Sequence, residues 1–141
     1  DVSPVLDALI ATVGGSYTFA LNDNVVLAFS GFVQDTQSQS ADAAAASNNL
    51  SAAMTWAPNT VPITRSGNLG VTHTDYKILL GMYSERRSDD AVTLELSLTH
   101  EDIQVYGFNP TFGVRGVRNY SNYNRYDTET VEAFTRLSTS F

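Results

Sequence analysis

The feature of this sequence that most constrains its fold is the alternation of residues 127–141, which end on an aromatic residue. In an extended strand, every second side chain points to the same face. One face of this stretch is mainly apolar and comprises Val131, Ala133, Thr135, Leu137, Thr139 and Phe141. The other comprises Glu132, Phe134, Arg136, Ser138 and Ser140. One face can therefore lie in lipid while the other meets water.

Six earlier segments alternate in the same way, namely residues 9–21, 25–34, 50–56, 66–76, 92–99 and 107–119. The clearest is 92–99, where Val92, Leu94, Leu96 and Leu98 alternate with polar residues, and the weakest is 66–76. The expected strands exceed the roughly five to six residues usual in soluble sheets and suit tilted membrane spans. The pattern predicts an all-β fold, an antiparallel up-and-down transmembrane β-barrel with seven strands in this chain.

The predicted connections alternate between short and long. Residues 22–24, 57–65 and 101–106 form the shorter set, and residues 35–49, 76–90 and 120–126 form the longer, more polar loops. Residues 76–90 have an apolar middle and are also compatible with a strand, but a loop there keeps the two sets on opposite sides of a membrane. Short periplasmic turns and long external loops are typical of bacterial outer-membrane barrels, so we expect a periplasmic carboxyl terminus.

The distribution of charge supports this orientation of the strands. On the faces assigned to lipid, charged residues occur only at strand ends, as Asp35, Asp75, Arg118 and Glu129. The opposite faces carry the candidate lumen-lining residues Glu95, Arg115, Glu132 and Arg136. If Arg115 lies opposite Glu132 in the last hairpin, Arg115 lies diagonally from Glu95 and the charges alternate in sign. Such a ladder either braces the wall or lines a path for ions or substrate.

Composition excludes several other classes of protein. The net charge of −7 argues against a nucleic-acid partner, and the absence of Cys excludes disulfides and thiolate metal sites. The longest apolar stretch, residues 5–13, is too short for a membrane-spanning helix. A soluble β-sandwich remains an alternative, because alternation alone does not exclude it.

An odd number of strands raises the question of closure. Single-chain bacterial barrels have even strand numbers, and an open sheet would leave unpaired edges in lipid. We therefore expect residues 1–141 to be the carboxyl-terminal part of a barrel, with 127–141 as its final strand. A missing amino-terminal part, another chain or a second copy would complete it. The first residues have no basic start, so we expect the mature remainder of an exported chain.

Several local motifs resemble one known family. RRSDD at residues 86–90, LSLTHEDIQVYGFNP at 96–110, SNYNRYD at 121–127 and the closing Phe141 are similar to the carboxyl-terminal barrel of the Slam family, the surface lipoprotein assembly modifiers. The resemblance implies a barrel of about fourteen strands joined to a periplasmic helical-repeat domain. It also implies movement of lipoproteins or small secreted proteins across the outer membrane. The chain itself contains no helical-repeat region.

We expect no enzyme activity, cofactor or metal site. His73 and His100 are the only candidate bases for a nucleophile such as Ser97 or Ser121, and no nucleophile elbow is present. A Ca²⁺ site at Asp89, Asp90 and Asp102 lacks the spacing of a calcium loop, so solvated charges are the simpler interpretation. Gly14 and Gly15 favour bending or close packing over phosphate binding.

Together with the predicted barrel, the resemblance implies an outer-membrane translocator for surface lipoproteins or small proteins. A passive porin-like channel or structural surface barrel is the alternative. The expected partners are outer-membrane lipid, the rest of the barrel, a lipoprotein cargo and the outer-membrane assembly machinery. Leu137 and Phe141 would provide the assembly signal.

Overall fold

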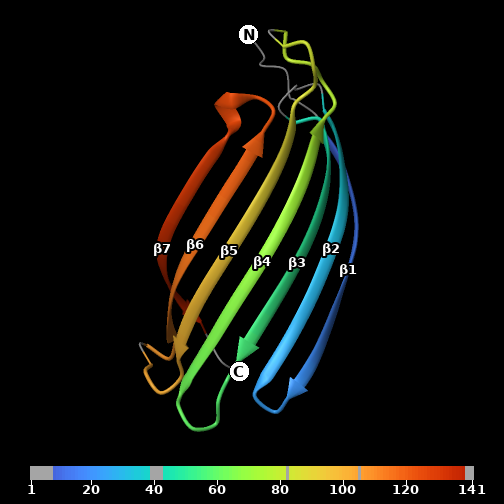
Figure 1. Ribbon diagram of the computed structural model, residues 1–141. Helices are drawn as coiled ribbons and strands as arrows, with labels where there is room; N and C mark the ends of the chain where they lie inside the picture. Colours follow the sequence, from blue (N-terminus) through green and yellow to red (C-terminus); the bar gives the residue numbers. More distant parts are fainter. Residues whose placement is uncertain (1–7, 39–42, 82, 105, 139–141) are drawn as a thin grey trace.

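The computed structural model describes residues 8–38, 43–81, 83–104 and 106–138 (Figure 1). These residues form one seven-stranded antiparallel sheet in which the strands follow one another in chain order. The strands are β1 (Ala8–Asn22), β2 (Val25–Ser38), β3 (Ala45–Trp56), β4 (Ile63–Tyr76), β5 (Ser88–His100), β6 (Asn109–Ser121) and β7 (Thr128–Ser138). A single 3-10 turn, η1 (Asn124–Tyr126), precedes β7. The predicted all-β, up-and-down arrangement of seven strands is confirmed.

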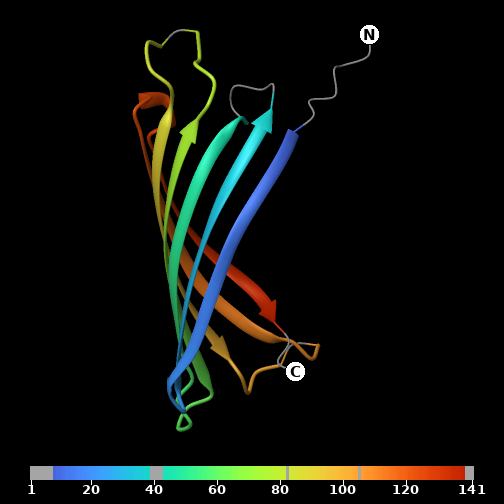
Figure 2. The same cartoon turned by 90° about the vertical axis from the view of Figure 1, so that its right-hand side faces the viewer.

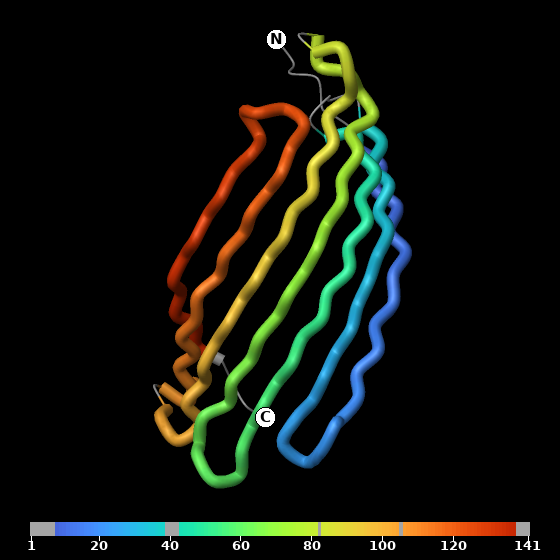
Figure 3. Tube along the Cα trace, viewed as in Figure 1, coloured from blue at the N-terminus to red at the C-terminus, as the bar shows by residue number. Residues whose placement is uncertain are grey.

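The connections fall into two sets at opposite ends of the sheet, as Figures 1 and 3 show. The links β1–β2, β3–β4 and β5–β6 lie at one end, here called the turn end. The links β2–β3, β4–β5 and β6–β7 lie at the other, the loop end. In the tightest link, the Asn22 side-chain Oδ1 accepts a hydrogen bond of 2.9 Å from the Asn24 amide. Asn and Asp residues favour such turns. The short connection predicted at residues 22–24 is thus a tight turn.

The sheet is curved and twisted but not closed (Figure 2). Within the described ranges, β1 pairs only with β2 and β7 pairs only with β6. An open sheet with two free edges agrees with the expected half-barrel. In the part of the chain that the structure describes, no helix is long and apolar enough to cross a membrane.

The sheet is one layer thick, and large apolar side chains are left uncovered. Leu9, Val13, Leu50 and Val131 are each 66–79% exposed. Among the described residues, the only buried apolar side chains are Ala44, Ala45 and Tyr123, all toward the loop end. No second layer of described residues covers the apolar face, as the alternative of a β-sandwich would require.

The predicted boundaries are wrong where strands continue beyond their apolar residues. Residues 35–49 were expected to be a loop, but β2 continues to Ser38 and β3 begins at Ala45. These extensions are rich in small and polar residues, so hydropathy could not separate them from a loop. β4 likewise begins at Ile63 rather than at residue 66, and β6 begins at Asn109, which leaves Phe108 just before it. Residues 76–90 were expected to be a loop, and the described residues of 77–87 form no strand. The bounds of that loop are wrong, because β4 includes Tyr76 and β5 begins at Ser88 rather than at residue 92.

Close packing at Gly113 provides a test of the sheet. A Cβ there would overlap the Phe134 ring and lie 2.7 Å from the Leu96 carbonyl oxygen. We expect Gly113→Ala to lower the free energy of unfolding by about 1–3 kcal/mol, because overpacking forces neighbours to shift. Gly116→Ala is the matched control, since its Cβ would meet nothing within 4 Å. Urea unfolding of both variants measures the difference, and equal stabilities would contradict the packing.

Candidate functional site

The strand register gives the sheet two chemically different faces. Glu95 lies opposite both Asn68 in β4 and Arg115 in β6, and Arg115 lies opposite Glu132 in β7. We call the face that carries these residues the inner face and the opposite one the outer face. Along the middle of β5, the inner residues are half-buried and the outer residues Val92, Leu94, Leu96 and Leu98 are exposed. Side chains crowd together on the concave side of a curved sheet, so the inner face is the concave one.

Short polar side chains on the inner face bond from strand to strand. Ser30 and Ser51 hydroxyls are 2.7 Å apart, and Thr99 and Thr111 hydroxyls are also 2.7 Å apart. Further bonds join Asn49 Nδ2 to Thr72 Oγ1 at 2.8 Å and Ser47 Oγ to Thr74 Oγ1 at 3.0 Å. The inner face is therefore hydrophilic along most of its length.

The four predicted lumen-lining residues come together on this face. Arg115 Nη1 lies 3.8 Å from Glu132 Oε1, so the predicted pairing across the last hairpin is confirmed. Arg136 Nη1 donates a hydrogen bond of 3.0 Å to Glu95 Oε1, and thus reaches across β6 to β5. We call these four residues the charge ladder.

One detail of the predicted charge ladder is wrong. Glu95 lies directly opposite Arg115 rather than diagonally from it in the pairing of β5 with β6. The carboxylate of Glu95 nevertheless bonds to Arg136, whose guanidinium carbon also lies 4.0 Å from the centre of the Phe134 ring. Concave curvature brings β5 and β7 side chains within reach, which a flat drawing of the strands does not show.

The outer face is apolar in its middle and charged toward the loop end. Asp35 pairs with Lys77, and Arg118 Nη2 lies 2.6 Å from Asp127. His73 Nδ1 is 2.7 Å from Asp90, and its Nε2 is 3.1 Å from Asp75. Pairing of these groups lowers the cost of holding charge beside an apolar surface.

Arg65 is a charged outer-face residue that the sequence interpretation missed. It lies toward the turn end of β4, opposite Trp56 and Leu98. Its guanidinium carbon is 4.3 Å from the centre of the Trp56 ring. The expected strand began one residue after Arg65, so the sequence did not assign Arg65 to a face.

A buried ion pair organises the loop end. Arg87 Nε donates hydrogen bonds of 3.0 Å to both carboxylate oxygens of Asp89. Their side chains are only 11% and 8% exposed. Burial acts to lower the pKa of the Arg87 guanidinium, but the Asp89 carboxylate, together with Tyr76 and Tyr126, outweighs burial and the pKa is raised. Asp89 is therefore not the solvated charge that the sequence suggested, because Arg87 folds back onto it.

Tyrosines surround this ion pair and tie together two connections of the loop end. The Arg87 guanidinium carbon lies 4.1 Å from the Tyr76 ring centre and 3.4 Å from that of Tyr126. Tyr83 and Tyr123 stack with their ring centres 3.7 Å apart, and the Tyr123 hydroxyl donates to the Glu85 carbonyl. We call Tyr76, Tyr83, Arg87, Asp89, Tyr123 and Tyr126 the loop-end cluster. It fixes residues 83–87 against residues 122–127.

The histidines do not approach the candidate nucleophiles. Ser97 and Ser121 lie on the inner face, whereas His73 and His100 lie on the outer face. His100 ends β5 at the turn end. Among the described residues, no group of three or more His, Asp or Glu side chains is arranged to hold a metal ion.

The proposed assembly signal is only partly visible. Leu137 lies on the outer face of β7 opposite Pro110, and it is 55% exposed. Phe141 lies outside the described residues. The side chain of Leu137 is thus available to an external partner, while the role of both residues stays a prediction.

Comparison with known proteins identifies one family. The family model described as surface lipoprotein assembly modifier matches residues 6–141. No curated protein and no solved structure matches. Because the match covers nearly the whole chain, the resemblance seen in residues 86–141 is confirmed and extends to β1. The chain belongs to the surface lipoprotein assembly modifier family.

Proposed function

We propose that this chain forms part of an outer-membrane β-barrel that helps surface lipoproteins or small proteins to leave the cell. The observation that carries the proposal is the two-faced open sheet: an apolar outer face, a polar inner face with the charge ladder, and two unpaired edges. The family name connects such a chain with surface lipoprotein assembly.

The outer face supports a position in the membrane. In β4 its residues run from Arg65 through Gly67, Leu69 and Val71 to His73. These nine positions match the roughly 9–11 residues of a tilted spanning strand. Short turns face the periplasm in outer-membrane barrels, so the turn end, with the end of β7, would lie there.

The edges support a larger barrel. Unpaired backbone N–H and C=O groups are not tolerated in lipid, so β1 and β7 need partners there. An amino-terminal part of the same protein, another chain or a second copy would supply them, and residues 1–141 would be the carboxyl-terminal part. Leu137, together with Phe141, would present the final strand to the assembly machinery.

The charge ladder suits passage of a polypeptide. Its two Glu and two Arg residues balance, so the wall attracts neither acidic nor basic segments strongly. Balanced, hydrated walls let varied sequences pass without tight binding.

The export role is tested in cells that make a surface lipoprotein. Deleting the gene for the full-length protein is expected to leave the lipoprotein inaccessible to protease added outside, and complementation restores access. A variant with Glu95→Lys and Glu132→Lys, which makes the wall wholly basic, should restore it poorly. Equal surface exposure with and without the protein would contradict the role.

A passive porin-like channel is the second candidate, favoured by the exposed arginines of the charge ladder. The Arg115 and Arg136 side chains are 42% and 57% exposed. In planar bilayers, we expect Arg136→Ala to shift the permeability of the full-length protein toward cations, because Glu95 loses its partner. The shift should be at most about fivefold, since exposed pairs contribute no more than about 1 kcal/mol. Arg118→Ala, on the outer face, is the control, and an equal shift there would contradict a channel lined by the charge ladder.

A further inference from the structure

Arg65 differs from the other basic side chains of the outer face. Lys77 and Arg118, toward the loop end, are paired with carboxylates. Arg65 lies toward the turn end and makes no ion pair with any residue that the structure describes; its guanidinium lies over the Trp56 ring instead. The outer face therefore presents one unneutralised cation at the turn end, half-buried beside apolar surface.

Arg65 lines an apolar groove on one side. This groove, of about 530 Å³, lies over β4, β5 and β6. Its apolar walls are Leu96, Leu98, Phe112 and Val114. Each of these side chains belongs to the outer face, and no acidic residue lines the groove.

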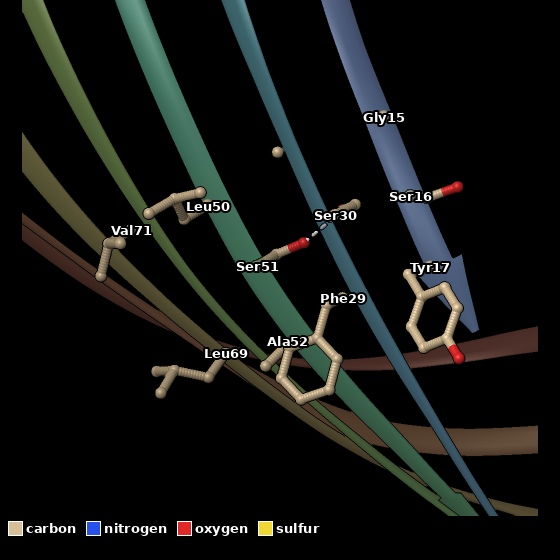
Figure 4. Close-up of a pocket in the computed structure, with 11 residues that line it drawn as sticks. Gly15, Ser16, Tyr17, Phe29, Ser30, Leu50, Ser51, Ala52, Leu69 and Val71 are labelled. Carbon is tan, nitrogen blue, oxygen red and sulfur yellow. Dashed lines mark hydrogen bonds between the residues drawn. The ribbon is translucent and has the colours of Figure 1, made fainter. Parts of the chain in front are cut away.

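A second apolar path begins beside Arg65 and runs over the neighbouring strands. A small groove of about 210 Å³ includes Gly67, the next outer-face residue of β4. It shares Phe29, Ala52 and Leu69 with a larger groove of about 640 Å³. In Figure 4, Tyr17 and Phe29 flank that groove on the side of β1 and β2, and Leu50, Leu69 and Val71 flank it on the side of β3 and β4. Gly15 and Gly31, which have no side chains, leave space in this larger groove.

We propose that Arg65 and these two paths bind one diacyl phospholipid, with its phosphate on Arg65 and one acyl chain along each path. The proposal rests on the membrane position proposed above. The planar guanidinium forms paired hydrogen bonds with phosphate oxygens, and Trp and Arg are the side chains that anchor strands at a membrane interface.

The dimensions agree with one leaflet. The distance along β4 from Arg65 to Val71 is about 20 Å at the usual rise per residue. For a strand tilted by about 45°, this spans about 14 Å of depth, close to half of the roughly 30 Å hydrocarbon core. An acyl chain whose phosphate lies on Arg65 would therefore end near the middle of the membrane.

The position of Arg65 at the turn end indicates which class of lipid would bind there. Carboxylates neutralise the cations at the loop end, which would face the outer leaflet. The unpaired Arg65 at the turn end would face the inner leaflet, which contains glycerophospholipid. The ligand is therefore a glycerophospholipid rather than lipid A.

Native mass spectrometry of the full-length protein, delipidated and then supplied with phosphatidylglycerol, tests the site. We expect one tightly retained phospholipid, a loss of retention of tenfold or more in Arg65→Gln, and unchanged retention in Arg118→Gln. Diacylglycerol, which has no phosphate, should not be retained. Unchanged retention in Arg65→Gln, equal retention of diacylglycerol, or preference for lipid A would each overturn the proposal.

A second variant tests the path for the acyl chain. A Cβ at Gly67 would lie 3.3 Å from Leu96 Cδ2, the end of a flexible side chain, so Gly67→Leu should fold and fill the path. Retention should fall at least fivefold, whereas Gly116→Leu, on the outer face of β6, should retain lipid normally. Retention equal to the parent protein in Gly67→Leu would contradict the path. A protein that inserts into vesicles but retains no lipid would refute only this site, whereas failure to insert would refute the proposed membrane function.

Discussion

Leu96→Arg is expected to destabilise the membrane-inserted sheet by about 2–4 kcal/mol, the cost of an Arg side chain facing lipid near mid-bilayer. Leu96 is an outer-face residue in the middle of β5, opposite Gly67 and Val114, and it is 49% exposed. In the proposed position, lipid rather than protein surrounds it. Urea unfolding of the full-length protein in phospholipid vesicles, followed by the heat-dependent shift in gel mobility, measures the loss.

The matched control is Thr93→Arg on the same strand. Thr93 lies on the inner face between Gly70 and Val117, so its replacement points into the polar side of the sheet. This variant should lose less than about 1 kcal/mol, as substitutions toward a hydrated lumen usually do. If the two variants were equally destabilised, the outer face would not be the lipid face.

The second large effect is expected at the loop-end cluster. Arg87→Met removes the partner of Asp89 while that carboxylate stays buried, and breaking such a pair costs about 3–5 kcal/mol. Because the cluster joins residues 83–87 to residues 122–127, the cost should appear as local opening of both connections. Hydrogen exchange of the backbone amides, resolved by residue, should show faster exchange in both segments and little change in the middle of β4 and β5.

Two variants check the cause of that opening. Arg86→Met removes an exposed positive charge from the neighbouring residue and should leave exchange unchanged. Arg87→Met combined with Asp89→Asn should recover part of the protection, because the buried carboxylate is neutralised. The interpretation fails if Arg86→Met opens the connections as much as Arg87→Met does.

Strand identity was predictable from the sequence because each strand has one apolar face and one polar face. In β5 the alternation of Val92, Leu94, Leu96 and Leu98 with polar residues fixed both the strand and its orientation. The extensions of β2 and β3 were not predictable, since Thr36, Ala45 and Ser47 show no contrast between the faces. Beyond the apolar band, backbone pairing continues without a hydropathy signal.

The sequence predicted which residues form the charge ladder, but it did not predict all of the contacts between them. The face of Glu95, Arg115, Glu132 and Arg136 followed from alternation, and the Arg115–Glu132 pair followed from the last hairpin. The bond from Arg136 to Glu95 depends on curvature, which the sequence pattern does not encode.

Contacts between the loops were not predictable. The loop-end cluster joins Tyr83 and Tyr123 across separate connections, and their sequence segments give no signal that they meet. The motifs around these residues supported the family resemblance, and the structure adds a physical role for them in fixing the loops.

The central claim, that the outer face lies in lipid and the inner face meets water, is tested most directly by spin labels on β5. This sequence has no Cys, so single Cys variants at positions 92–98 carry one label each in these residues. In vesicles, the account predicts high accessibility to oxygen at 92, 94, 96 and 98, and high accessibility to a water-soluble nickel complex at 93, 95 and 97. Equal accessibility at all seven positions, or nickel access at the even positions, would contradict it.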